Sequence, residues 1–190
     1  IGVVGVAIGT ALLPLMSRQL GEADSVVGGT AAAHSQNRAI ELALLLALPA
    51  AAALIAVPSE VISALFERGA FSAADTAATA NALAAYSIGL PAYVLIKALT
   101  PGFYARHDTK TPVKIAVAAI TVNLTVSVAL MGPLAHTGLA LATAIAGWVN
   151  AGALGATLYA KGLWRPDAGL KDRVWRTVLA ALVMTGGILG

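Results

Sequence analysis

Long apolar runs alternate with short polar connections along the whole chain. Four runs come close to, or exceed, the roughly 20 apolar residues that a helix needs to cross a bilayer. They are residues 42–59, 76–96, 115–135 and 137–160, and shorter apolar runs, 1–16 and 177–190, stand at the two ends. Because the runs are continuously apolar, whereas lipid-facing strands alternate, the pattern predicts helices. We expect an all-α, polytopic membrane helix bundle of six helices, the first and last truncated.

The longest polar connection occupies residues 21–41, with the sequence GEADSVVGGTAAAHSQNRAIE. It is expected to be a loop that leads into the amphipathic start of the second helix.

The composition supports a membrane protein. Hydrophobic residues make up 58% of the chain and charged residues 11%, against roughly 25% charged in soluble domains, and the mean hydropathy is +0.83. Cysteine is absent, which excludes disulfides, thiolate nucleophiles and cysteine metal sites. The sequence starts at Ile1 without a basic leader and stops inside an apolar run, so we expect a fragment cut at both ends, without a signal peptide.

Lysine and arginine gather in alternate connections. Ten of the twelve follow the first, third and fifth helices: Arg18, Arg38, Arg106, Lys110, Lys114, Lys161, Arg165, Lys171, Arg173 and Arg176. The second connection has only Arg68, beside acidic residues, and the fourth has none. By the positive-inside rule the odd connections are cytoplasmic, so the first helix runs from outside to inside. The basic pI of about 9.5 then reflects topology, and no basic stripe with interleaved aromatic residues indicates nucleic-acid binding.

No catalytic arrangement is visible in the sequence. His34, His107 and His136 lie in three different connections, without metal-ligand spacing to carboxylates. There is no phosphate-binding loop, nucleophile elbow or pair of intramembrane carboxylates. We therefore expect neither an enzyme nor a cofactor or metal cluster.

Charged side chains at membrane depth are the main functional candidates, because ionisable groups there are costly. Arg18 closes the first helix and either anchors it at the headgroups or binds an anion through its planar guanidinium. Lys97 either snorkels beside an aromatic belt or belongs to a polar side of the third helix that faces protein or a water-filled cavity. That side is a stripe at helical spacing: Tyr86, Tyr93, Lys97, Thr100 and Tyr104.

Polar groups also occur in the middle of the fourth and fifth helices. Asn123 and Ser127 lie one turn apart and are expected to hydrogen-bond a neighbouring helix. The alternative is a weak monovalent-cation site that they form with Thr143.

Several short strings carry a family resemblance. They are GVAIGTALLPLMSR near the start, LFERGAF at 65–71, AYSIGL at 85–90 and LTPGFYARHDTKTPVKIA at 99–116. These strings resemble the MurJ/MviN lipid II flippases, with similarity from residue 1 to about 159. The motif loop that carries most of this resemblance holds Pro101, Gly102, Phe103, Tyr104, Arg106, Asp108, Thr111 and Pro112.

The resemblance implies a place within a larger fold. Members of the MOP exporter superfamily have two lobes, and in this family fourteen helices include two that form a lipid groove. The six runs would be the eighth to thirteenth helices, which gives the same orientation as the lysine and arginine count. Residues 1–160 would then form a second-lobe bundle, 161–176 a cytoplasmic basic loop and 177–190 the start of a truncated lipid-groove helix.

The resemblance also implies a function. The family moves lipid II, a lipid-linked peptidoglycan precursor, from the inner to the outer leaflet of the bacterial inner membrane by alternating access. Arg18 matches one of its cavity arginines, and Lys97, Tyr93 and Tyr86 are the further candidates for substrate binding. The implied partners are lipid II or a similar polyprenyl-diphosphate-linked glycan, membrane lipids and the missing first lobe, without which no transport is expected. Alternatives are another MOP exporter, for a polysaccharide lipid or for drugs, and a purely structural bundle.

Overall fold

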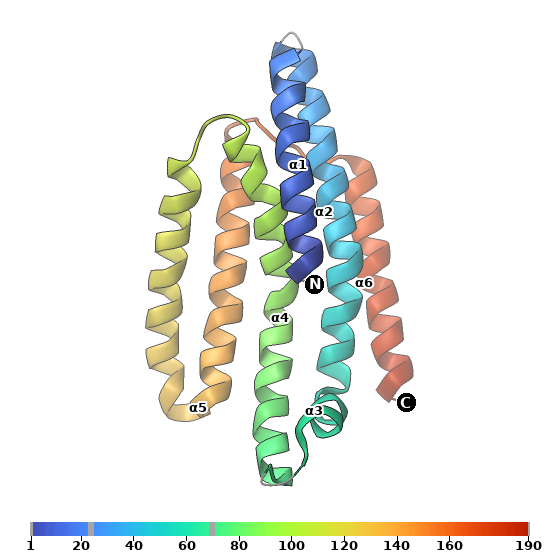
Figure 1. Ribbon diagram of the computed structural model, residues 1–190, viewed down its shortest axis with the longest axis vertical. Coiled ribbons are helices and arrows are strands. Elements are labelled where there is room, and N and C mark those ends of the chain that lie inside the picture. Colours follow the sequence, from blue (N-terminus) through green and yellow to red (C-terminus); the bar gives the residue numbers. More distant parts are fainter. Residues whose placement is uncertain (1, 23–24, 69–70, 190) are drawn as a thin grey trace.

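The computed structural model describes residues 2–22, 25–68 and 71–189, and these residues form helices joined by short connections (Figure 1). The helices are α1 (Gly2–Glu22), α2 (Ser25–Ala56), α3 (Pro58–Phe66), α4 (Ala73–Tyr104), α5 (Lys110–Ala160) and α6 (Ala168–Leu189). No strand occurs in the described ranges. The predicted all-α class is therefore confirmed.

α5 is a hairpin of two antiparallel arms (Figure 1). Lys110–Gly132 and His136–Ala160 are each long and apolar enough to cross a membrane, as are Thr30–Ala56 of α2 and Ala73–Tyr104 of α4. The reversal is tight: a Cβ added at Gly138 would lie 2.5 Å from the carbonyl oxygen of Leu130. With α1 and α6 at the ends of the chain, the bundle has the predicted series of six long segments.

Two predicted boundaries are wrong. The expected loop at 21–41 is helical from Ser25 onward, because its polar side chains pack inside the bundle, where Gln36 and Asn37 are buried. α6 begins at Ala168, so the basic connection is only 161–167. Its first turn is stabilised where Leu170 N donates to Asp167 Oδ1 over 2.7 Å, a bond of the kind that caps helix N-termini.

α4 is the central helix. It packs against α1, α2, α3 and α5, while α6 packs against α2. The largest buried cluster joins α2, α4, the second arm of α5 and α6 through Ile40, Leu44, Ala98, Leu99, Phe103, Leu154, Leu158 and Leu170. A smaller cluster joins α1 to the end of α4, with Met16 fully buried in the same group as Ala105.

The connections divide between the two ends of the bundle, as the charge pattern predicts. The loop 105–109, the connection 161–167 and the end of α1 lie at the upper end in Figure 1, which we call the basic end. The reversal of α5, α3 and the start of α4 lie at the opposite end. Alternate connections thus share one end.

Candidate functional site

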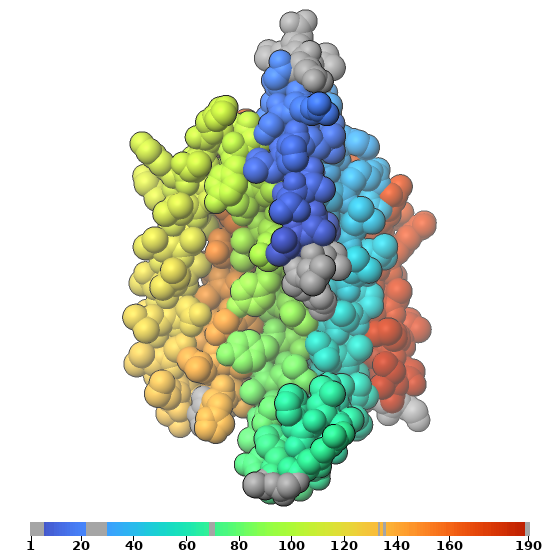
Figure 2. Space-filling model, in the orientation of Figure 1, coloured from blue at the N-terminus to red at the C-terminus, as the bar shows by residue number. Residues whose placement is uncertain are grey.

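One side of α4 is left uncovered between α1 and the first arm of α5. Figure 2 shows the surface of α4 in green between blue α1 and the yellow arm. Two hollows lie on this side: a groove against α1 and a cavity against α5. We call them the α1–α4 groove and the α4–α5 cavity.

The α1–α4 groove holds Lys97. It has a volume of about 420 Å³ and is lined by Val6, Gly9, Thr10, Leu13, Ile96, Lys97, Thr100, Pro101 and Tyr104. The Lys97 side chain is exposed, and within the described ranges no carboxylate pairs with it. An ammonium with no acidic partner, in a groove between two helices, is available to an anion.

Two threonines, Thr10 and Thr100, line the same groove as Lys97. Thr100 Oγ1 donates to the Ile96 carbonyl over 2.6 Å, and Thr10 Oγ1 donates to the Val6 carbonyl over 2.9 Å. Both hydroxyl protons are donated to the helix backbone, so each oxygen can still accept a hydrogen bond. Pro101 has no N–H for the Lys97 carbonyl four residues earlier, and a Cβ added at Gly9 would lie 3.4 Å from that carbonyl oxygen.

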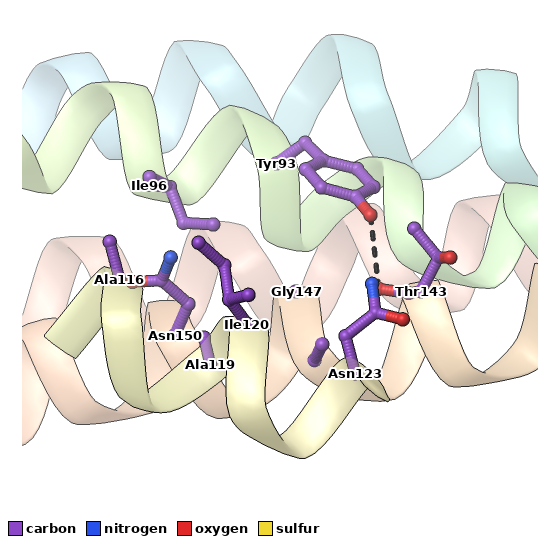
Figure 3. Close-up of a pocket in the computed structure, with 10 residues that line it drawn as sticks. Tyr93, Ile96, Ala116, Ala119, Ile120, Asn123, Thr143, Gly147 and Asn150 are labelled. Atoms are coloured by element: carbon purple, nitrogen blue, oxygen red, sulfur yellow. Dashed lines mark hydrogen bonds between the residues drawn. The ribbon is translucent and has the colours of Figure 1, made fainter. Parts of the chain in front are cut away.

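The α4–α5 cavity holds Tyr93 (Figure 3). Its volume is about 290 Å³, and Asn123, Thr143 and Asn150 supply its other polar lining. The Tyr93 hydroxyl donates to the Thr143 carbonyl over 3.0 Å. The ring packs near Gly147, where a Cβ would lie 3.4 Å from Tyr93 Cζ. Tyr93 therefore reaches toward α5.

The predicted stripe on α4 thus divides. Lys97, Thr100 and Tyr104 line the α1–α4 groove, Tyr93 lines the cavity, and Tyr86 is 43% exposed outside the lining of either hollow. Ile96 borders both hollows. The stripe is continuous along α4, but the two neighbouring helices separate its members into two environments.

The three residues of the proposed cation site lie close together. Ser127 Oγ donates to Asn123 Oδ1 over 3.0 Å, so its bond lies within one arm of α5 and the predicted bond to a neighbouring helix is wrong for Ser127. Thr143 Oγ1 donates to the Leu139 carbonyl over 2.8 Å. Asn123 and Thr143 line the α4–α5 cavity, and Ser127 is outside its lining. The geometry brings together neutral oxygens, the ligand type that hard cations accept.

Arg18 lies near the end of α1, two residues beyond Met16, and its side chain is exposed. No carboxylate pairs with it in the described part of the chain. Met16 shares a buried cluster with Ala105, so Arg18 lies at the basic end, near the loop that follows α4. Arg18 and Lys97 are thus both exposed, and neither has an acidic partner among the residues that the structure describes.

The motif loop begins with a close helix–helix contact. Gly102 lies against Gln36 of α2, and an added Cβ would be 2.7 Å from Gln36 Nε2. Gln36 is fully buried and donates to the Leu99 carbonyl over 3.3 Å. Pro101 is buried beside it and Phe103 is fully buried in the main cluster. This half of the motif is therefore packing.

The second half of the motif ties two connections together. Arg106 donates to the Gly102 carbonyl over 2.6 Å and to the Leu163 carbonyl over 3.2 Å, and its burial lowers the pKa of the guanidinium. Asp108 accepts from Thr111 N and Thr111 Oγ1 at 3.0 and 2.7 Å, at the start of α5. Pro112 is buried in the first turn of α5, where its missing N–H costs nothing.

An ion pair completes this junction. Lys161 Nζ lies 2.9 Å from Asp108 Oδ2. The hydrogen bonds from Lys161 and Thr111 lower the pKa of the Asp108 carboxyl to about 2, so the carboxylate is charged at any physiological pH. His107, between Arg106 and Asp108, has a φ of 58°, a left-handed conformation uncommon for a residue other than glycine.

Sequence reasoning missed the contribution of Asn37 on α2. Its side chain is 3% exposed; Nδ2 donates to the Arg165 carbonyl over 3.0 Å and Oδ1 accepts from Trp164 Nε1 over 2.6 Å. Glu41, one turn later, pairs with both Arg38 and Arg173. The sequence shows two adjacent amide residues, Gln36 and Asn37, shortly before an apolar run. It does not show which residues they contact.

The histidines remain separate. His34 Nδ1 lies 4.0 Å from Asp167 Oδ2, while His107 and His136 are exposed at opposite ends. Within the described ranges no group of three or more histidine and acidic side chains could hold a metal ion.

Comparison with known proteins matches the whole chain to a single protein family. The family profile described as "Lipid II flippase MurJ" matches residues 1–190. The "Probable lipid II flippase MurJ" of Rhizobium meliloti (strain 1021) is 45% identical over 190 residues, covering 99% of this chain and 34% of the relative. The protein of that name from Rhizobium tropici is 46% identical over 189 residues (100% and 35%). The "Lipid II flippase MurJ" of Burkholderia cenocepacia is 36% identical over 187 residues (96% and 35%). The chain therefore spans about a third of the length of these relatives.

Proposed function

Because this chain belongs to the lipid II flippase MurJ family, we propose that the full-length protein moves lipid II from the inner to the outer leaflet of the bacterial inner membrane by alternating access. The chain would supply most of the second lobe, and the rest of the protein would supply the first. Transport is then a property of the whole protein, and this third of it would not transport alone.

The observation that best supports this proposal is the uncovered side of α4, where the Lys97 ammonium lies in a groove between helices and has no acidic partner among the described residues. A diphosphate-linked glycan cannot cross hydrocarbon unaided, because burying its charges without compensation is very costly. Cations and hydroxyl oxygens in a water-filled cavity can replace that hydration. Reversible release favours a few separate cations over a dry, fully paired clamp.

We assign Arg18 and Lys97 to the anionic part of the substrate and the tyrosines to its neutral part. Arg18 offers a planar fork that matches two phosphate oxygens, while Lys97 acts as a point charge. Tyr86 is exposed on the same side and would contact sugar or peptide. Tyr93 would act indirectly, because its hydroxyl already donates to Thr143.

The proposed orientation puts the basic end in the cytoplasm, following the positive-inside rule. A single cysteine at Thr109 or at His136, in a full-length protein freed of other cysteines, tests this with an impermeant maleimide on intact cells. We expect labelling at position 136 and none at 109 until the cells are permeabilised. The reverse pattern would overturn the orientation.

The transport assay uses the purified full-length protein in vesicles with fluorescent lipid II. We expect the fluorescent lipid II of the inner leaflet to become accessible to an external quencher faster than in protein-free vesicles. Parallel vesicles carrying a polyprenyl-diphosphate-linked polysaccharide precursor, or a cationic drug, test the other MOP exporter activities. Movement of one of these, without movement of lipid II, would replace the proposed substrate.

A monovalent cation at Asn123, Ser127 and Thr143 is a secondary proposal, supported by the cavity that Asn123 and Thr143 share and by the hydrogen bond from Ser127 to Asn123. If the site binds sodium, sodium chloride should raise the thermal stability of the full-length protein above that in equimolar choline chloride. Asn123→Ala should remove the difference. An equal Tm in both salts would leave these residues as helix-packing groups.

A further inference from the structure

One short helix lies across the others. α3 begins at Pro58, two residues after α2 ends at Ala56. The apolar span of α2 also ends at Ala56. In Figure 1 α3 is seen nearly along its axis, while the long helices run vertically, and it lies near the level at which α5 reverses. α3 therefore lies roughly perpendicular to the long helices, at the level where α2 ends and α5 reverses.

The side chains of α3 form two unlike sides. Ile62 is buried and packs toward the bundle, where α3 contacts α4. Leu65 and Phe66 follow three and four residues later, one on each flank of Ile62, and they are 61% and 55% exposed. Glu60 is exposed on the polar side. The apolar arc is thus only partly covered by the bundle.

The apolar surface continues past the end of the helix. The ring centroid of Phe71 lies 6.3 Å from that of Phe66, so the chain returns to α4 through a second aromatic residue on the same side. Figure 2 shows α3 projecting from the lower part of the molecule. Two large exposed apolar side chains on a projecting helix are unfavourable in water.

We propose that α3 is an interfacial helix whose Leu65 and Phe66 insert into the boundary between headgroups and acyl chains of the leaflet at this end. Helices of this kind lie in the membrane plane with one apolar side buried to a shallow depth. α3 carries one charged residue, Glu60 on its polar side, and no basic residue. Its partner is therefore a zwitterionic lipid surface, and binding is hydrophobic rather than electrostatic. The proposal does not depend on which substrate the protein moves.

A fluorophore scan of the full-length protein tests the proposal. The environment-sensitive dye NBD is attached to single cysteines at Leu65 and Phe66, with Glu60 as the matched control on the polar side. The protein is reconstituted in phosphatidylcholine vesicles, with or without phosphatidylglycerol. All three positions are exposed, so the labels leave the buried packing intact. Quenching is measured with a lipid carrying a nitroxide near its headgroup and, separately, with aqueous iodide.

We expect blue-shifted emission at positions 65 and 66, quenching by the lipid nitroxide several-fold stronger than at position 60, and little change with phosphatidylglycerol. Strong iodide quenching at 65 and 66, equal to that at 60, would place α3 in water and overturn the proposal. Blue-shifted emission without nitroxide quenching would also overturn it, because another part of the protein would then cover these side chains.

Discussion

Polar side chains are bonded within the chain at the basic end but are left available on the uncovered side of α4. At the basic end, Arg106, Asp108 and Asn37 each bond a partner in another element of the chain. Along the α1–α4 groove, Lys97 is exposed and unpaired within the described ranges. In the string with the stronger resemblance, Arg106 and Asp108 are thus engaged within the chain, whereas Thr100 and Tyr104 line the groove. Arg18 and Lys97, for which the described ranges show no acidic partner, are the candidates for contact with a substrate.

Part of the difference follows from burial. Leaving a buried polar group such as Asn37 unbonded costs about 1–3 kcal/mol, whereas Arg106 and Asp108 are part-buried and their bonds join the loop after α4 to the 161–167 connection. A substrate-binding cation must instead keep its hydrogen-bonding capacity for the ligand. Changes in the two regions should therefore separate into effects on folding and effects on transport.

The largest expected effect is at Arg18. Arg18→Ala in the full-length protein should abolish complementation of a strain depleted of its own flippase, with protein levels unchanged. Arg18→Lys should keep only part of the activity, because the ammonium lacks the planar fork. Normal growth with Arg18→Ala would reduce this residue to a membrane anchor.

Lys97 should show a partial loss of transport. Lys97→Met keeps the apolar stem and removes the charge, so lipid II movement in vesicles should slow while thermal stability stays the same. Lys97→Arg should retain more activity than the methionine variant. Equal rates for Lys97→Met and wild type would mean that Lys97 only snorkels to the interface.

At the basic end, Gly102→Ala should affect folding. Its Cβ would lie 2.7 Å from Gln36 Nε2, and overpacking of this kind typically costs about 1–3 kcal/mol. Gly152→Ala is the matched control, because nothing lies within 4 Å of a Cβ there. Thermal unfolding in detergent measures both variants.

A second substitution identifies the cause of that loss. Gln36→Ala combined with Gly102→Ala should recover part of the stability lost by Gly102→Ala alone, because the clashing amide is gone. If Gly102→Ala unfolds at the same temperature as Gly152→Ala, the close contact between α2 and α4 is not a constraint.

The smallest effect is expected from the Asp108–Lys161 pair. Asp108→Asn and Lys161→Met should each lower the Tm slightly, the double variant should lower it by less than their sum, and transport should be unaffected. The folded carboxyl has a pKa of about 2, below its ordinary 3.8. The stabilisation is therefore complete above about pH 4 and is lost as the pH falls through about 2. A transport defect at unchanged Tm would contradict this structural assignment.

Long apolar runs were the most predictable feature. Spans of 18 or more apolar residues have few alternatives to a membrane helix, so the runs at 76–96, 115–135 and 137–160 all lie within α4 and α5. The polar stretch 21–41 was misassigned because its burial depends on α4 and on the 161–167 connection. Local polarity does not reveal such partners.

Candidate site residues divide in the same way. Helical spacing alone grouped Tyr86, Tyr93 and Lys97 on one side of α4. Their separation into groove, cavity and open surface depends on where α1 and α5 pack, and that is a long-range property.

The sequence by itself determined the class, the number of long segments and the alternation of their ends, because a bilayer imposes length, apolarity and charge sidedness on each segment separately. Tertiary structure alone decided that α3 lies across the bundle, that Gln36 and Asn37 are buried, and that Arg106 and Asp108 are bonded, while Lys97 has no acidic partner in the described part of the chain. Each of these features depends on contacts between side chains of helices that are distant in the sequence. A local pattern of apolar and polar positions carries no information about such contacts.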